Sequence, residues 1–413
     1  MKNYKNYEGC NMNYTQRVFW MVLNESIHKR KLELKDIKRI DFEELLQLAI
    51  NHNVASLVYY GLNRTNTINI MPKDVVNKLK RETVVTSLSQ NMHINNIENV
   101  LKEFRSENID VVVLKGLVIR AFYPRPEFRT MSDADIVVKK ENLESAINVL
   151  EKLGYLENGR SDVDICFVNN NSRIELHWNL ISKNKFNGGA EFEEEFWNRV
   201  VEVEVGDSKA LSLNYEDLAV HLVVHLFKHL AYKGCGIRYF SDLVVLFENK
   251  EKEINWESFM EKIRKYNLEK STRIILYICK KYLGMNINYQ LDIEDEINEQ
   301  YLEWLLNDIT TNGVFGKSNI SEELARSLSF YSDNELSPIR KYISVFLPPV
   351  EKVRANYKYA EKFKILIPFA YIHRILKWTF DKSITNDNKK SICTKGLSII
   401  KEKKIVMDWL ELN

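Results

Sequence analysis

The sequence predicts an α+β protein in which a small αβ core with a mixed sheet lies between a helical N-terminal region and a larger helical C-terminal region. Apolar residues recur at spacings of three and four up to about residue 105, and helical spacing returns after residue 215. Between them, continuous and alternating apolar runs typical of strands occupy residues 109 to about 205. We therefore expect three regions, at residues 1–105, 106–213 and 214–413.

The N-terminal region is predicted to consist of helices with no chemistry of its own. The helical segments are expected at residues 18–23, 42–50 and 72–104. Asp41 directly precedes the second segment, where its carboxylate can accept hydrogen bonds from the first free N–H groups of a helix. This region is expected to pack on the central one.

The central region is expected to follow the order strand, helix, strand, helix, strand, strand. The apolar run Val111–Leu114 leads into Lys115-Gly116, which suggests a buried strand followed by a helix start. The next strand is expected over residues 133–138, and an amphipathic helix over residues 141–153 is ended by Gly154. Residues 164–168 and 172–178 are predicted to pair as a hairpin around a turn of three asparagines.

The C-terminal region is predicted to be helical again. The expected helices lie at residues 217–231, 237–247, 256–266 and 270–283, with several later ones. Leu347-Pro348-Pro349 interrupts this pattern because proline cannot continue a helix. Residues 352–404 form a basic segment, which is either a solvated helix face or a surface that attracts an anionic substrate.

Composition places the chain among ordinary globular proteins. Of its 413 residues, 45% are hydrophobic and 28% charged, which excludes overall disorder. The 59 basic and 57 acidic residues nearly cancel to +2, so the total charge indicates neither nucleic acid nor a membrane as partner. The five cysteines include no Cys-x-x-Cys pair, which favours reduced thiols in a cytosol.

Membrane and export signals are not expected. The N-terminus lacks the apolar core of a signal peptide. The most membrane-like stretch, Ile365–Phe380, is interrupted by Pro368, His373, Arg374 and Lys377 and falls short of a spanning helix. A cytoplasmic protein with no membrane partner is therefore predicted.

Two aspartates one residue apart are the most informative feature of the chain. In a strand, Asp133 and Asp135 project from the same face, and their mutual repulsion is relieved by a cation between them. Glu175 lies in the alternating run 173–178 and converges with them if the two strands are neighbours. Hard divalent cations such as Mg²⁺ prefer these oxygen ligands. Asp162 and Asp164 compete with Glu175 for the third position.

Two cationic residues nearby have alternative interpretations. Lys115 either ends a strand in solvent or, with the backbone N–H groups after Gly116, meets a triphosphate. Arg129 either pairs with the nearby acids or contacts a phosphate through its planar guanidinium. The sequence leaves both choices open.

The order of these motifs resembles the polymerase-beta-like nucleotidyltransferase superfamily, and within it the bacterial branch of uncharacterised nucleotidyltransferases. The matching motifs are Leu114-Lys115-Gly116, Arg129-Thr130-Met131-Ser132-Asp133-Ala134-Asp135, Leu153-Gly154-Tyr155 and Glu175-Leu176-His177-Trp178. The likeness continues through residues 225–229, 237–242 and 347–349 and covers most of the chain. The chain departs from the superfamily in having Lys115-Gly116 where Gly-Ser or Gly-Gly is common, and Glu175 where many relatives carry Asp.

The resemblance implies that the protein transfers a nucleoside monophosphate from a nucleoside triphosphate, such as ATP, to an acceptor and releases pyrophosphate. It implies Asp133, Asp135 and Glu175 as catalytic residues and as ligands of one or two Mg²⁺ ions. The residues implied in binding the nucleotide are Lys115, Gly116, Arg129, Ser132 and Lys228. The alternative is a catalytically inactive nucleotide-binding or protein-interaction module on the same scaffold.

The sequence gives only a preference about the chemical class of the acceptor. A near-neutral total charge disfavours a large nucleic acid, so a small-molecule acceptor is favoured over a tRNA or a protein. The preferred base and the oligomeric state are not indicated.

Three histidines recur every four residues in the predicted helix after residue 215. The spacing of His221, His225 and His229 invites a zinc site, but the glutamate of His-Glu-x-x-His is missing and three side chains spread over two turns do not easily reach one ion. Packing and hydrogen bonding are therefore the favoured roles.

Overall fold

The computed structural model of the 413-residue chain divides into two compact units. The structure describes residues 12–31, 34, 36–65, 67–161, 163–170, 172–180, 195–232, 234–313, 347, 350, 353–354, 357–380, 398 and 401–412. One unit comprises residues 1–225 and 237–296, and the other comprises residues 226–236 and 297–413. The three-region division predicted from the sequence stays a prediction.

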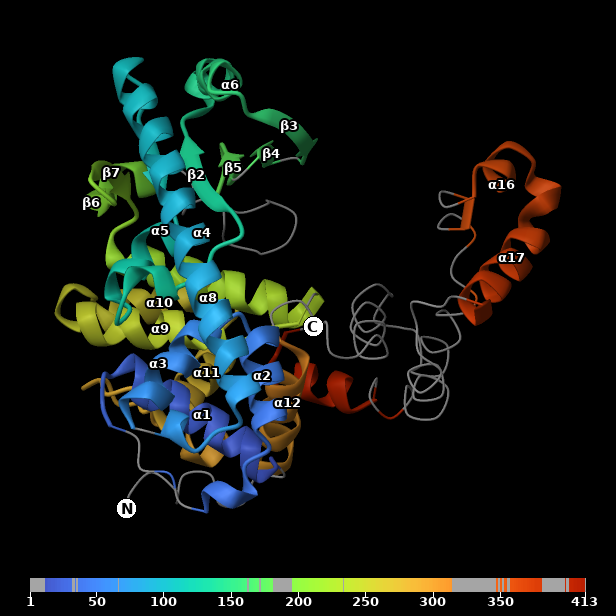
Figure 1. Cartoon of the computed structure of the whole chain (residues 1–413). Helices are drawn as coiled ribbons and strands as arrows, with labels where there is room; N and C mark the ends of the chain where they lie inside the picture. Colours follow the sequence, from blue (N-terminus) through green and yellow to red (C-terminus); the bar gives the residue numbers. More distant parts are fainter. Residues whose placement is uncertain are drawn as a thin grey trace. The chain divides into compact units, whose positions relative to one another are not determined.

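The first unit contains one sheet, and helices precede and follow its strands along the chain (Figure 1). Its helices are α1 (Tyr14–Ile27), α2 (Phe42–Asn51), α3 (Ala55–Arg64), α4 (Lys73–Ser106), α5 (Gly116–Ile119), α6 (Leu143–Lys152), the first part of α8 (Tyr215–Tyr232), α9 (Ile237–Lys250), α10 (Trp256–Lys265) and α11 (Glu269–Leu283). Short 3₁₀ helices include η4 (Arg120–Phe122) and η5 (Pro126–Phe128). The predicted α+β class is confirmed.

The sheet is mixed, with seven strands in the order β3-β4-β5-β2-β1-β7-β6. The strands are β1 (Val111–Val113), β2 (Ala134–Val138), β3 (Leu156–Arg160), β4 (Asp164–Asn169), β5 (Ser172–His177), β6 (Val201–Val205) and β7 (Ser208–Ser212). β2 pairs with β5 and β1 with β7 in parallel, and the other pairs are antiparallel. β1 and β2 are buried throughout, as expected for central strands with continuous apolar runs.

Local signals in the sequence account for several element ends. Asp41 caps α2, accepting hydrogen bonds from the N–H groups of Glu43 and Glu44 at 3.1 and 3.0 Å. Gly154 follows α6 with a φ of +81°, a conformation that glycine adopts without a steric penalty and that ends a helix. The predicted hairpin is present as β4 and β5, whereas β3, β6 and β7 were not among the six elements expected for the core.

The sheet has two unlike faces at its centre. Along β5, Ser172, Ile174 and Leu176 are buried, and Nδ1 of His93 on α4 lies 2.9 Å from Oγ of Ser172. This face of the strand is therefore turned toward α4. Because side chains alternate along a strand, Glu175 and His177 project from the opposite face.

The second unit contains α12 (Glu299–Asn312), α16 (Lys358–Lys362), η10 (Lys364–Leu366) and α17 (Ile367–Phe380), and residues 401–409 are also helical. The end of α8, from residue 226, belongs to this unit too. None of the helices in the described parts of the chain combines the length and the hydropathy that crossing a bilayer requires. Pro348 and Pro349 of the predicted break, and part of the basic segment at residues 352–404, lie outside the described residues.

Candidate active site

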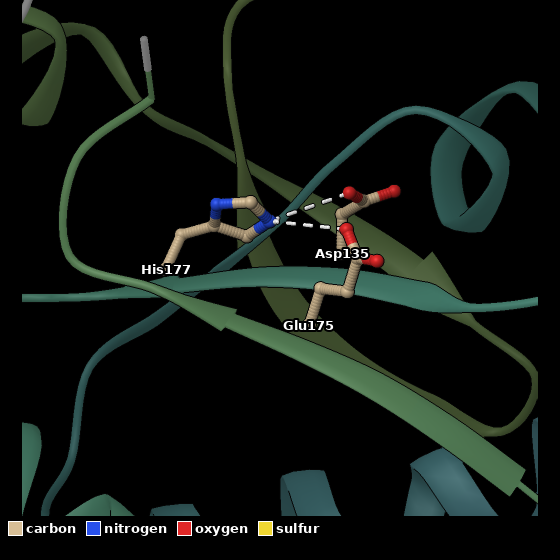
Figure 2. A group of neighbouring side chains, drawn as sticks. All are labelled: Asp135, Glu175 and His177. Carbon is tan, nitrogen blue, oxygen red and sulfur yellow. Dashed lines mark ion pairs between the residues drawn. The ribbon is translucent and has the colours of Figure 1, made fainter. Parts of the chain in front are cut away.

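Two carboxylates and an imidazole meet where β2 and β5 run side by side. The parallel register pairs Asp135 with Glu175 and Val137 with His177, so the three polar side chains leave the same face of the sheet (Figure 2). Nε2 of His177 lies 3.4 Å from Oδ1 of Asp135 and 3.9 Å from Oε2 of Glu175. One potential ligand atom from each residue lies within 4.8 Å of the others. We call Asp135, Glu175 and His177 the acidic cluster.

Lys115 is directly attached to the acidic cluster. Its Nζ donates a hydrogen bond of 2.7 Å to Oδ1 of Asp135, and the two side chains are 13% and 8% exposed, so solvent screens this ion pair little. The sequence left open whether this ammonium group ends a strand in solvent or meets a triphosphate, and the family resemblance implied the triphosphate. In the structure it neutralises one carboxylate of the cluster.

The backbone at Lys115 is unusual for a residue with a side chain. Lys115 has φ +48° and ψ −114°, and the N–H of Leu117 donates to the carbonyl of Leu114 at 3.2 Å. These values are close to the first central position of a type II′ turn, which glycine normally occupies. Holding lysine there costs of order 1–3 kcal/mol, and strain of this kind concentrates at functional sites.

The charges of the site shift one another's pKa values. Burial disfavours the charge of Lys115, but Asp135, Asp133 and Glu175 outweigh it and raise the pKa of Lys115. Burial also acts against the ionised form of Asp135, yet Lys115 and His177 hold its pKa well below the ordinary value. For Glu175, burial and the negative charges of Asp135 and Asp133 all act in one direction and raise its pKa. The cluster thus contains one firmly ionised carboxylate and one that holds its proton more readily.

Asp133 lies at the edge of the cluster without belonging to it. It stands just before β2, is partly exposed, and accepts a 3.3 Å hydrogen bond from Oγ of Ser132. Its charge raises the pKa of both Glu175 and Lys115, which places it within electrostatic range of the site. The expectation that Asp133, Asp135 and Glu175 bind one cation together stays a prediction for Asp133.

The segment that leads into the aspartates is fixed by side chains from distant helices. Gln90 on α4 donates through Nε2 to the carbonyl of Met131 and accepts through Oε1 from the N–H of Met131, both at 2.9 Å. Both residues are buried. Oγ1 of Thr130 donates to the carbonyl of Asn53 at 3.0 Å, and Arg238 on α9 donates to the carbonyl of Thr130. The backbone two residues before Asp133 is therefore held from several directions.

Arg129 pairs with Asp242 and not with the nearby acids that the sequence offered as its partners. Its Nη2 lies 2.6 Å from Oδ2 of Asp242 and its Nε lies 3.2 Å from Oδ1 of Asp242, a two-point contact to a carboxylate on α9. Tyr123 donates a third hydrogen bond to Asp242 at 2.7 Å. Although burial opposes it, the charge of Asp242 raises the pKa of Arg129. In this structure Arg129 is the buried partner of Asp242 rather than of Asp133 or Asp135.

Gly116 packs closely against Arg129 and the segment before β2. A Cβ at this position would overlap Nη1 of Arg129 and the side chain of Met131, so a larger residue requires these side chains to shift, and Arg129 is held in place by Asp242. The predicted role of Gly116 at a phosphate stays a prediction beside this structural one.

The remaining candidates are less closely tied to the cluster. Ser132 is exposed, and Lys228 is exposed on the part of α8 that belongs to the second unit, so their roles in nucleotide binding stay predictions. Asp164 pairs in register with His177 across β4 and β5 and accepts a hydrogen bond from Ser161. Asp162 lies outside the described residues.

The histidines of α8 make ring contacts. His221 and His225 stack with their centroids 6.3 Å apart, and His225 also meets Tyr239 at 5.7 Å. Among the described residues, the single group of three or more potential ligands close enough to share a metal ion is the acidic cluster. The contacts of His221 and His225 agree with the packing role favoured from the sequence.

His177 is the member of the cluster that the sequence interpretation did not select. A signal was available, since it stands two residues after Glu175 on an alternating strand and so shares its face. Nδ1 is buried and has no hydrogen-bond partner among the described residues, whereas Nε2 makes the ion-pair contacts with Asp135 and Glu175 at 3.4 and 3.9 Å. A buried ring nitrogen without a partner, on a histidine beside two carboxylates, suits a ligand that the protein itself does not supply.

Comparisons with known proteins identify a family and a distant likeness to solved structures. A family model described as uncharacterised nucleotidyltransferase matches residues 38–284, more than half of the 413-residue chain. Curated proteins yielded no match. Among solved structures, the solution structure of the antibiotic-resistance factor ANT(2'')-Ia is similar over 43% of this chain and 92% of that chain, with 10% identity and a TM-score of 0.33. A likeness at that TM-score carries no functional argument.

Proposed function

Because the chain belongs to the uncharacterised nucleotidyltransferase family and is a nucleotidyltransferase, we propose that it transfers a nucleoside monophosphate from a nucleoside triphosphate to a small-molecule acceptor. Pyrophosphate is the second product, and the reaction depends on Mg²⁺. The acidic cluster is the observation that carries this proposal, since its residues leave two adjacent parallel strands at one place.

The donor set of the cluster fits a divalent cation. Asp135 and Glu175 supply the oxygen ligands that Mg²⁺ prefers. Burial raises the pKa of Glu175, and so do the negative charges of Asp135 and Asp133, whose repulsion a cation would relieve. His177 can add a nitrogen ligand or hold a carboxylate in place. When bound, Mg²⁺ neutralises the triphosphate and polarises its α-phosphorus.

The residues of the chain then have distinct tasks. Glu175 accepts the proton of the acceptor hydroxyl, since its carboxylate lies beside Asp135 and His177 at the place where the cation would bind. The acceptor oxygen forms a bond to the α-phosphorus while the bond to the bridging oxygen breaks, and pyrophosphate leaves with that electron pair. Lys115 supplies positive charge beside the phosphates, next to Asp135.

A small-molecule acceptor is supported by the net charge of +2, since proteins that bind a large nucleic acid usually carry a marked basic excess. The proposal does not specify which nucleoside triphosphate is used.

The test combines binding and turnover. Titration calorimetry with Mg²⁺ and each of the common nucleoside triphosphates should reveal one that binds, and a pyrophosphate-release assay with that nucleotide and a panel of hydroxyl-bearing small molecules should show turnover. The double variant Asp133→Asn/Asp135→Asn should lose Mg²⁺-dependent release, and circular dichroism identifies the folded fraction, since Asp135 is the buried ion-pair partner of Lys115. Asp110→Asn is the matched control, because Asp110 is exposed, precedes β1 and pairs only with Lys139 in the described structure. Full activity in the double variant would refute the assignment.

A further inference from the structure

One oxygen of the acidic cluster is already in contact with a positive charge. Oδ1 of Asp135 is the oxygen that lies 3.4 Å from Nε2 of His177, and it also accepts the 2.7 Å hydrogen bond from Nζ of Lys115. All three side chains are largely buried, so water and salt weaken the contact between the ammonium group and the carboxylate little. The ammonium group therefore lies at an oxygen that the proposed cation would use.

A divalent cation and the ammonium group cannot share this oxygen at low cost. Mg²⁺ binds its oxygen ligands at about 2.1 Å, so an ion on Oδ1 would lie within about 5 Å of Nζ if Lys115 kept its hydrogen bond. Positive charges at that separation repel each other strongly where water is scarce. Binding of the cation through Oδ1 therefore requires the ammonium group to move away from Asp135.

The backbone holds Lys115 beside Asp135 without help from its side chain. The N–H of Leu114 donates to the carbonyl of Asp135 at 3.0 Å. The carbonyl of Lys115 accepts from the N–H groups of Val118 and Ile119 at 3.1 and 2.9 Å. Because a φ of +48° favours glycine, the lysine side chain only adds strain to this turn. What the side chain contributes is its charge at Asp135.

We propose that Lys115 is a counter-ion that keeps the acidic cluster closed to divalent cations until a nucleoside triphosphate binds. The triphosphate offers oxygen acceptors to the ammonium group, whose flexible four-carbon stem allows it to swing from Asp135 to a phosphate. Oδ1 of Asp135 is then free for the cation that accompanies the nucleotide. This inference rests on the proposed function and adds an order of events to it, in which the cluster takes up its cation together with the nucleotide rather than before it.

The exchange makes the binding of the two ligands cooperative. Because the nucleotide draws the ammonium group away from Asp135, it raises the affinity of the cluster for the cation. Thermodynamic linkage then requires that the cation raise the affinity for the nucleotide by the same factor. Without the ammonium group the cation has no competitor at Asp135, so removing Lys115 should strengthen cation binding and shrink that factor. A merely structural role for Lys115 predicts the opposite change, since a disturbed site binds its cation more weakly.

The experiment measures binding of Mn²⁺, as a substitute for Mg²⁺, to the full-length chain without nucleotide, by electron paramagnetic resonance of the unbound ion. Lys115→Gly removes the ammonium group and suits the backbone conformation, and Lys115→Met keeps an unbranched side chain without charge. We expect both variants to bind Mn²⁺ at least tenfold more tightly than the wild type. In calorimetry with a non-hydrolysable nucleoside triphosphate, the factor by which Mn²⁺ raises nucleotide affinity should fall at least tenfold in both variants.

Two controls locate the effect. Lys139→Met removes an ammonium group that lies 3.4 Å from a carboxylate oxygen of Asp110, at the other end of the paired strands β1 and β2, and it should leave Mn²⁺ binding unchanged. Adding Asp135→Asn to Lys115→Gly should abolish the gained binding, because the cluster then lacks its ionised aspartate. Circular dichroism compares the folded content of all variants. If Lys115→Met does not fold, Lys115→Gly decides, since glycine fits the turn.

The possible failures of this inference and of the proposed function are distinguishable. Mn²⁺ binding by the Lys115 variants that is no tighter than in the wild type would overturn the counter-ion role, and so would gained binding that survives Asp135→Asn. If the wild type nevertheless releases pyrophosphate with Mg²⁺, the proposed function stands and only the counter-ion role is refuted. Gained binding that depends on Asp135, in a protein that binds no nucleoside triphosphate, would refute both nucleotidyl transfer and the nucleotide as the trigger.

Discussion

Replacing Arg129 decides between its two possible roles, as a structural partner and as a phosphate ligand. In the structure its guanidinium contacts both carboxylate oxygens of Asp242, and the two side chains are 7% and 1% exposed. Arg129→Gln would leave Asp242 buried with one remaining charge-neutral donor, the hydroxyl of Tyr123. Removing one partner of a buried ion pair typically costs about 3–5 kcal/mol, because the other charge stays uncompensated.

Urea denaturation followed by tryptophan fluorescence measures this cost as a lower midpoint. The control is Arg125→Gln, since Arg125 is exposed and its nearest carboxylate, on Glu127, lies 3.7 Å away; its loss should change stability by less than about 0.5 kcal/mol. The double variant Arg129→Met/Asp242→Leu removes both charges and should recover most of the loss. A stability change below about 1 kcal/mol in Arg129→Gln, together with a strong loss of nucleotide affinity, would refute the structural role.

Three further predictions concern the site and its support. Gln90→Leu should destabilise the protein by about 2 kcal/mol, because the buried N–H and C=O of Met131 lose their partner, and it should lower the rate of pyrophosphate release in the fraction that remains folded. Gly116→Ala should cost roughly 1–3 kcal/mol in thermal or urea unfolding, because the added methyl group overlaps Arg129; an unchanged midpoint would contradict this packing. Mn²⁺ binding, measured by calorimetry over a pH series, should weaken as the pH falls, because protons compete with the metal ion for the carboxylate of Glu175. Since the pKa of Glu175 is raised, the weakening should begin above the pH range in which an ordinary glutamate titrates. Glu175→Gln should flatten this pH dependence, and a wild-type affinity that is insensitive to acid would contradict the prediction.

Much of the local structure could be predicted from the sequence because the signals are local. Asp41 caps the start of α2 and Gly154 ends α6. The two strand-like runs on either side of the asparagine turn form β4 and β5. The convergence of Asp135 and Glu175 could also be inferred, although the two residues are 40 positions apart in the sequence. Each is an acid within a run typical of a strand, and the two approach each other once those strands are neighbours.

The parts that were missed depend on contacts across the fold. Arg129 and Asp242 are separated by 113 residues, and no local pattern pairs them. Lys115 has its ammonium on Asp135 because the turn before α5 brings them together, and the sequence alone left its partner open. β3 is an edge strand with all five residues exposed, so it lacks the apolar alternation by which strands are recognised.

In the proposed function, Asp135, Glu175 and His177 hold a divalent cation when the nucleotide is bound. Crystals grown with Mn²⁺ and a non-hydrolysable nucleoside triphosphate test it directly, since Mn²⁺ substitutes for Mg²⁺ and is located by its anomalous scattering. The account predicts an anomalous peak within bonding distance of carboxylate oxygens from both Asp135 and Glu175, with Nζ of Lys115 moved from Asp135 toward a phosphate. A bound nucleotide with no peak at these residues, and with Lys115 still paired to Asp135, would contradict it.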